Sequence, residues 1–339
     1  MAGTGIAHLR AADASLMRVD DLTVEFRRRG STVHAVSGIS IDVLEGETLG
    51  LVGESGCGKS TTGRAIVQLP RPSSGSVTFR GRQLTTLSNR EMRKLRPSLQ
   101  MIYQDPISSL NPCHTVGEIV GEPLKVWGSD KDSRQAKVDD VLRAVGLDPQ
   151  TARGKYPKEF SGGQCQRICI ARALILDPKL LICDEPVSAL DVSVQAQILN
   201  LLEDMKARYG LTMVFIAHDL AVVKNISDRV VVMYLGKLCE VGPPDELYAA
   251  PAHPYTEALL SAIPEVDVDS PKARPKLLTG EVASSTDPPS GCRFRTRCPR
   301  AEPRCAEEEP MMRPLEADEN RFVACHFPLV AAKQVSSAS

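Results

Sequence analysis

A glycine-rich stretch that ends in lysine and serine carries the clearest chemistry in the chain. It fits the pattern G-x-x-x-x-G-K-[ST], and its residues are Gly53, Glu54, Ser55, Gly56, Cys57, Gly58, Lys59, Ser60 and Thr61. Glycines let a backbone turn tightly around an anion and point several N–H groups inward. In such a loop Lys59 neutralises the β- and γ-phosphates of a nucleotide, and the Ser60 hydroxyl binds Mg²⁺. The motif predicts nucleotide binding and leaves kinases, GTPases and many ATPases open.

Two adjacent carboxylates, Asp184 and Glu185, follow a continuous apolar run at 180–183. Because α/β folds bind ligands at the carboxyl ends of their strands, we expect this pair to lie near the phosphates. Asp184 suits the Mg²⁺ shell, which leaves Glu185 to polarise the attacking water. The alternative, a pair of helix-capping acids before Pro186, is plausible for one of them but does not account for both.

A second candidate anion site is formed by Ser161, Gly162, Gly163 and Gln164, which open a helical pattern at 166–176. A serine and two glycines at the start of a helix offer free N–H groups and a hydroxyl. One ATP does not need two such sites from one chain. Two ATPase chains that face each other, each supplying one half, would use both.

Four of the ten cysteines, Cys292, Cys298, Cys305 and Cys325, lie within 34 residues at spacings of x5, x6 and x19. These spacings match neither the C-x₂₋₄-C pairs of common zinc folds nor those of ferredoxins. They indicate four thiolates that could share one metal, and the alternative is four unlinked cysteines in a polar tail. A short proline-rich segment buries little apolar surface, which favours a cross-link, such as a shared metal, that holds the segment together.

Alternating strands and helices position these groups, and this alternation indicates an α/β core. β-branched residues from 18 to 43 predict antiparallel strands around a polar turn at 28–32. Buried strands are predicted at 48–52, 180–183 and 212–217, and helices at 59–69 and across much of 115–150.

Composition sets the expected domain boundaries. Residues 1–16 are small and polar and predict a disordered lead, and residues 17–260 form the main domain. Prolines after Ser261 mark a linker, and the cysteine-rich extension follows it, so that 261–339 is expected to be a separate appendage.

The bulk properties exclude several classes of protein. Apolar residues make up 42% and charged residues 24%, and the net charge of −1 gives no basis for binding nucleic acid through bulk electrostatics. No run approaches the roughly 20 apolar residues that a membrane span needs, and no secretory signal is visible. The chain is therefore expected to stay in the cytosol and to reach a membrane only through a partner.

Together these motifs resemble the ATP-binding cassette (ABC) ATPases from about Arg18 to Val241. The resemblance implies an α/β P-loop core, a mixed sheet with antiparallel strands, and a helical subdomain at about 88–178. It also implies that ATP is sandwiched between the phosphate loop of one subunit and Ser161 and Gly163 of another.

Further residues gain a role only through this resemblance. Gln104 is similar to the glutamine that touches Mg²⁺ and water and relays to the membrane subunit, and 188–191 resembles the loop that contacts the opposite subunit. His218 resembles the histidine that holds the γ-phosphate and positions the water. Phe26 lies where the family places an aromatic that stacks on adenine; a phenylalanine that packs locally is the alternative.

Three stretches, 104–112, 160–174 and 253–256, are similar to oligopeptide and dipeptide permease ATPases, and the residues around Ser161 and around Glu185 resemble their second, or F-type, subunit. This implies a peptide importer with an extracytoplasmic peptide-binding protein, two transmembrane permease subunits and two different ATPases. The chain would then be peripheral, at the cytoplasmic face of the cell membrane. Nickel, glutathione and sugar importers share the subfamily, and a soluble ABC ATPase of translation or DNA repair is the alternative from another class.

The same permease ATPases carry a similar C-terminal cysteine pattern that is associated with a [4Fe–4S] cluster. The resemblance therefore favours a structural [4Fe–4S] cluster on the four cysteines, with zinc as the alternative metal.

Overall fold

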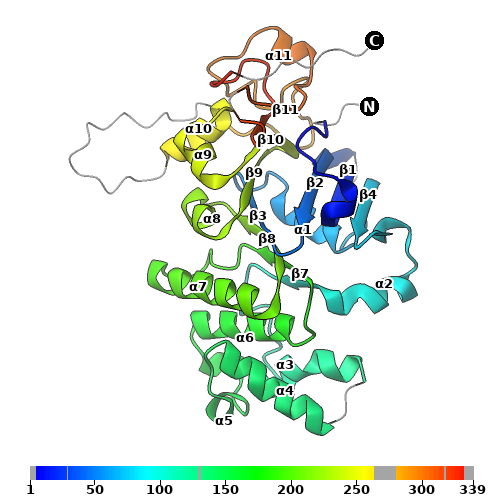
Figure 1. Cartoon of the computed structure of the whole chain (residues 1–339), viewed down its shortest axis with the longest axis vertical. Coiled ribbons are helices and arrows are strands. Elements are labelled where there is room, and N and C mark those ends of the chain that lie inside the picture. The colour runs from blue at the N-terminus through cyan, green and yellow to red at the C-terminus, as the bar shows by residue number, and fades with distance from the viewer. Residues whose placement is uncertain (1–4, 29, 129–130, 263–279, 317, 332–339) are drawn as a thin grey trace, which may run out of the picture. The chain divides into compact units, whose positions relative to one another are not determined.

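The computed structural model describes residues 5–28, 30–128, 131–262, 280–316 and 318–331 (Figure 1). The chain forms two compact units: the first combines Met1–Thr86 with Ala217–Ser339, and the second is Leu87–Ile216. The second unit begins beside residue 88, the expected start of the helical subdomain, but extends past its expected end at 178. It is longer because two strands and a long helix follow the helical part within the same unit.

One sheet of the first unit is antiparallel and has the strand order β2-β1-β4-β5. β1 (Ser15–Arg28) and β2 (Ser31–Leu44) form the hairpin that the β-branched alternation predicts. β4 (Ser74–Phe79) pairs with the other edge of β1, and β5 (Arg82–Gln83) pairs with β4. The side chains that point from this sheet into the core include Val19, Leu22, Val24, Ile39 and Ile41.

A second set of strands in the first unit is built around β3 (Thr48–Val52), which is buried along its whole length. β3 pairs in parallel with β9 (Arg229–Tyr234), and β10 (Lys237–Gly242) returns antiparallel to β9. α8 (Leu220–Ile226) packs on β3. The remaining helices of this part are α1 (Lys59–Ile66), α9 (Pro244–Ala249) and α10 (Pro254–Ser261).

The C-terminal extension continues this strand set. Its elements are α11 (Arg304–Glu307), β11 (Arg313–Pro314) and β12 (Phe322–Val323). β12 pairs antiparallel with β10, where Glu240 is opposite Val323, and β11 pairs with β12. The extension is therefore attached to the first unit by main-chain pairing, while residues 263–279 of the expected linker lie outside the described residues.

The N-terminal lead differs from the expectation of disorder. From residue 5 it is described in contact with the first unit, where His8 is 2% exposed and its Nε2 donates to the Ser40 carbonyl at 2.7 Å. Burial lowers the pKa of His8 to about 4. Arg10 pairs with Asp42 at 2.7 Å and with Glu47 at 2.5 Å. Polar contacts hold this segment, and its scarcity of apolar residues therefore does not imply disorder.

The second unit contains three parallel strands with β7 between the other two. β7 (Leu180–Asp184) pairs with β6 (Leu99–Ile102) on one side and with β8 (Thr212–Ala217) on the other. Its helices are α2 (Asn89–Leu95), α3 (Val116–Val126), α4 (Lys131–Ala144), α5 (Pro149–Ala152), α6 (Gly162–Leu174) and α7 (Val192–Tyr209). Short 3₁₀ helices of the chain lie at Ala12–Ala14, Leu84–Thr86, Arg96–Ser98 and Pro157–Glu159.

Within the described ranges, no helix combines the length and the apolar character that a membrane span requires. Both units instead place their apolar side chains in cores around β3 and β7, whose residues are buried throughout. The two strands end at the motifs that the sequence singles out, and this fixes where those motifs lie in each unit.

Candidate functional site

The phosphate loop connects the end of β3 to the start of α1 in the first unit. Its backbone has positive φ at all three of its glycines, 153° at Gly53, 78° at Gly56 and 106° at Gly58. A Cβ at Gly53 would lie 2.0 Å from the Met233 carbonyl oxygen, and one at Gly58 would lie 2.2 Å from that of Ala35. Both positions therefore exclude a side chain, and their conformation wraps the loop around the N-terminus of α1.

Lys59 lies inside this loop and is 4% exposed. Its Nζ donates to the carbonyl oxygens of Gly53 at 2.7 Å and Glu54 at 3.0 Å. The ammonium is thereby held at the concave side of the loop, where a phosphate would meet both its charge and the helix N-terminus. Of the other expected loop residues, Cys57 is buried, Gly58, Ser60 and Thr61 are half-buried, and Ser55 and Gly56 are exposed.

Glu54 makes two contacts that the sequence did not indicate. Its backbone N–H donates to Tyr255 Oη at 2.8 Å. Its carboxylate accepts two hydrogen bonds from Arg297 of the C-terminal extension, at 2.6 and 3.0 Å. The motif around Tyr255 was visible in the sequence without an assigned role, whereas an isolated arginine in a polar tail gives no signal.

In the second unit, Asp184 is the last residue of β7 and is fully buried, and Glu185 follows it half-exposed. Glu185 has a φ of 46°, in the left-handed region that costs energy for a residue with a Cβ. Its backbone N–H donates to the Ile216 carbonyl at 3.0 Å, and its Oε2 accepts from Gln104 Nε2 at 3.0 Å. The structure thus brings together two of the residues predicted to act in hydrolysis.

Ser161 and Gln164 form a reciprocal cap at the N-terminus of α6. The Ser161 N–H donates to Gln164 Oε1 at 3.0 Å, and the Gln164 N–H donates to Ser161 Oγ at 3.4 Å. Both residues are exposed, and Gly162 and Gly163 beside them are half-buried. The helix N-terminus of this motif is therefore accessible at the surface of the second unit.

His218 and Phe26 belong to the first unit. His218 is exposed and lies between the end of β8 and the start of α8. Phe26 is 40% exposed on β1, opposite Val33 of β2. Phe26 is thus accessible to a ligand from the rim of the hairpin.

The four cysteines of the extension line one small cavity together with His326 and two arginines, Arg295 and Arg300. Burial raises the pKa of the Cys292 thiol to about 11 and that of Cys325 to about 12. Among the residues that the structure describes, however, no three His, Cys, Asp or Glu side chains are grouped closely enough to hold a metal ion. The thiols converge without forming a complete ligand set.

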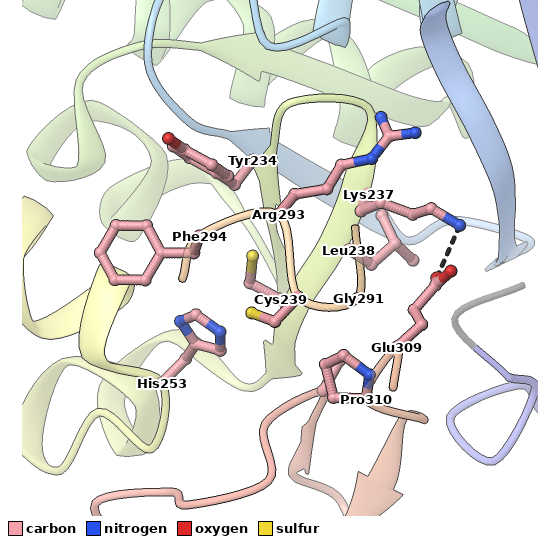
Figure 2. Close-up of a pocket in the computed structure, with 12 residues that line it drawn as sticks. Tyr234, Lys237, Leu238, Cys239, His253, Gly291, Arg293, Phe294, Glu309 and Pro310 are labelled. Atoms are coloured by element: carbon pink, nitrogen blue, oxygen red, sulfur yellow. Dashed lines mark ion pairs between the residues drawn. The ribbon is translucent and has the colours of Figure 1, made fainter. Parts of the chain in front are cut away.

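A second cavity adjoins the first and is lined by β9, β10 and the extension. Figure 2 shows Phe294 and His253 at one end and the Lys237–Glu309 ion pair, 2.6 Å long, at the other. Cys239 of β10 lines this cavity. The side chains of the extension therefore pack directly on the strands that precede it. Outside the extension, Cys165 and Cys169 of α6 are each 2% exposed and belong to the core of the second unit.

Two models of known protein families match parts of the chain. A model described as ABC transporter matches residues 36–188, and one described as Oligopeptide/dipeptide transporter, C-terminal region matches residues 239–305. The first match includes the phosphate loop, the Ser161–Gln164 motif and Glu185. The second reaches from β10 to the third of the four cysteines.

Close relatives align along nearly the whole chain. The oligopeptide transport ATP-binding protein OppF of Escherichia coli is 52% identical over 323 residues, which cover 91% of this chain and 95% of that protein. The putative oligopeptide transport ATP-binding protein YkfD of Bacillus subtilis is also 52% identical, over 92% of this chain and 95% of that protein.

Two solved structures share the fold at lower identity. CbiO1 of Clostridium perfringens superposes with a TM-score of 0.63 at 30% identity and covers 70% of this chain and 91% of that one. A dimeric ATP-binding cassette, MJ0796, in a post-hydrolysis state bound to ADP and Pi gives a TM-score of 0.62 at 26% identity, over 67% of this chain and 98% of that one.

Proposed function

Because the chain belongs to the family of oligopeptide ABC transporter ATP-binding subunits, we propose that it hydrolyses ATP to power the import of peptides through a membrane permease. The observation that carries this function is the 52% identity to OppF across 91% of the chain. The C-terminal match adds to it, because the model that matches residues 239–305 is described as the C-terminal region of oligopeptide/dipeptide transporters.

The roles at the ATP site follow from residue chemistry and family membership. Lys59 and the loop N–H groups bind the β- and γ-phosphates. Ser60, Asp184 and Gln104 would hold Mg²⁺, which supplies charge that stabilises the phosphoryl oxygens. Glu185 polarises the attacking water, and the hydrogen bond from Gln104 Nε2 orients its carboxylate.

Three further groups complete the proposed site. His218 holds the γ-phosphate and positions the water, and Phe26, exposed on β1, stacks on the adenine. The capped N-terminus of α6 offers Ser161, Gly162, Gly163 and Gln164 to the nucleotide of a partner subunit. The accessibility of this helix end supports the assignment, and the related cassette MJ0796 is described as dimeric.

The proposed partners follow from the same membership. We infer a second ATPase subunit, two transmembrane permease subunits and, indirectly, an extracytoplasmic peptide-binding protein. The chain would then act as a peripheral subunit at the cytoplasmic face of the cell membrane. Recovery of the permease subunits with the tagged full-length chain tests this assembly.

A metal on the four cysteines is a separate proposal. Their convergence on one cavity, with two arginines beside them that would offset thiolate charge, supports a shared metal, and the resemblance of the cysteine pattern to that of the permease ATPases favours a [4Fe–4S] cluster over zinc. Cys292, Cys298, Cys305 and Cys325 would be the ligands. A brown anaerobic preparation absorbing near 400 nm supports the cluster, and a colourless protein with stoichiometric zinc contradicts it.

Hydrolysis is tested most directly at Glu185. We expect Glu185→Gln to abolish turnover at the site that this glutamate serves, and so to lower phosphate release by the assembled transporter while ATP still binds, because the amide keeps the shape of the side chain but cannot polarise water. The measurement is phosphate release beside equilibrium binding of ATP. Glu203→Gln, at an exposed position on α7, is the matched control and should leave both unchanged. Undiminished phosphate release by Glu185→Gln would remove this residue from catalysis.

A further inference from the structure

An arginine of the C-terminal extension forms an ion pair with the phosphate loop. Arg297 Nη1 lies 2.6 Å from Glu54 Oε2, and Arg297 Nη2 lies 3.0 Å from Glu54 Oε1. The Arg297 side chain is 6% exposed and that of Glu54 is 26% exposed. Two parallel N–H···O bonds fix both the distance and the orientation of the carboxylate, which a single contact would not do.

The guanidinium is itself held by an aromatic group. Its carbon lies 5.9 Å from the centre of the Tyr234 ring, within the range of a cation–π contact. Tyr234 also contacts Phe294, three residues before Arg297, with ring centres 5.2 Å apart. This part of the extension is therefore packed against the end of β9, as Figure 2 shows for Phe294 and Tyr234.

Glu54 is held at its backbone as well. Its N–H donates to Tyr255 Oη at 2.8 Å, and Tyr255 is fully buried against Tyr234 and Phe294, with ring centres 4.8 and 5.3 Å away. The Glu54 carbonyl in turn accepts from Lys59 Nζ at 3.0 Å. The conformation of Glu54 thus connects the extension to the lysine that meets the phosphates.

We propose that Arg297 is a positioning residue of the nucleotide site, which holds Glu54 so that the phosphate loop and Lys59 keep their binding conformation. The C-terminal extension is then part of the ATP site and not only an appendage of the fold. This inference rests on the proposed function, because it assigns Arg297 to the loop that binds the phosphates.

The burial and geometry of the pair decide against a merely incidental contact. Exposed ion pairs contribute between zero and about 1 kcal/mol, because water screens them and the side chains lose freedom. Arg297 is almost fully buried and makes a bidentate contact. Arg304 and Glu308 form the contrasting pair in the same extension, at 2.9 Å with both side chains more than half exposed.

The test measures binding of a non-hydrolysable ATP analogue with Mg²⁺ by the full-length protein, and ATP hydrolysis by the assembled transporter. We expect Arg297→Met to weaken analogue binding about tenfold, a typical effect of losing charged hydrogen bonds. The KM for ATP should rise by a similar factor, while kcat at saturating ATP changes less than about twofold, because only the binding conformation is lost. Arg297→Lys should recover part of the affinity, and Arg304→Met should have no effect.

A variant on the loop side separates positioning from a loss of folding. Glu54→Gln should weaken binding to a similar degree, and combining it with Arg297→Met should add little, because both changes break the same contact. Additive losses, or an unchanged KM in Arg297→Met, would overturn the proposal. Lys59→Ala tests the proposed function separately from the role of Arg297. If Lys59→Ala also binds the analogue normally, then the proposed function itself fails.

Discussion

Gly163, in the first turn of α6, is the glycine of the Ser161–Gln164 motif that lies against another helix. A Cβ at this position would lie 2.6 Å from Cγ1 of Val194 on α7, whereas one at Gly162 would lie 3.5 Å from Leu190 Cδ2. We expect Gly163→Ala to lower the free energy of unfolding by about 1–3 kcal/mol, the usual effect of overpacking. Gly162→Ala has room for its methyl group and should be nearly neutral.

Denaturant unfolding of the four proteins, wild type, Gly162→Ala, Gly163→Ala and Gly163→Ala with Val194→Ala, checks this expectation. The double variant should recover much of the stability, because the truncated valine leaves space for the new methyl group. Equal losses in the two single alanine variants would show that the motif needs glycine for another reason.

At the scale of residues, the sequence predicts local chemistry well and long-range contacts poorly. The spacing from Gly53 to Thr61 indicates a phosphate loop, because its backbone requirements are local. The Glu54–Arg297 pair joins residues 243 positions apart, and no local pattern indicates it. The left-handed φ of Glu185 is also invisible in the sequence, because the tertiary fold imposes it on a residue type that rarely adopts it.

At the scale of elements, a buried carboxylate connects β10, α10 and β12. Glu240, 1% exposed, accepts from the backbone N–H groups of Ala252 at 2.9 Å and His253 at 2.8 Å, and pairs with Arg321 at 3.3 Å. Burial raises the pKa of Glu240, and Arg321 opposes that shift. The pair therefore helps to hold the extension against the first unit.

We expect Arg321→Met to destabilise the protein by about 3 kcal/mol at neutral pH, because it leaves a buried charge without its partner. A carboxyl whose pKa in the folded protein lies above its ordinary value of 4.5 makes the protein less stable as pH rises, because the buried group must ionise. Removing Arg321 takes away a charge that lowers this pKa, so the variant should be more sensitive to rising pH than the wild type. The deficit of Arg321→Met relative to wild type should therefore grow from pH 5 to pH 7.5. Unfolding at both pH values measures it, and Arg304→Met is the control; a deficit that shrinks with rising pH contradicts the assignment.

The strands differ in how well the sequence predicts them. The apolar runs at 48–52, 180–183 and 212–217 predict β3, β7 and β8, because a buried strand needs a continuous apolar stretch. β11 and β12 have two residues each, which is too short for any period to be recognised. The pairing of β12 with β10, and of β11 with β12, depends on the rest of the extension.

At the scale of the whole molecule, the proposed ATP sites are shared between two different subunits. This chain would supply Lys59 and Glu185 to one site, and Ser161 and Gly163 to the other. Glu185→Gln should consequently disable one site and leave the hydrolysis of the other, which depends on the Ser161 motif of this chain and the glutamate of the partner.

Adding Ser161→Arg to Glu185→Gln should remove that remaining hydrolysis. The larger arginine side chain would block the accessible N-terminus of α6, where a phosphate would bind. The matched control combines Glu185→Gln in this chain with the equivalent arginine substitution in the partner, which places both changes in one site and should leave the other active. Phosphate release by the two assembled transporters measures the difference. Equal residual activities would contradict the shared sites and indicate that each chain hydrolyses ATP by itself.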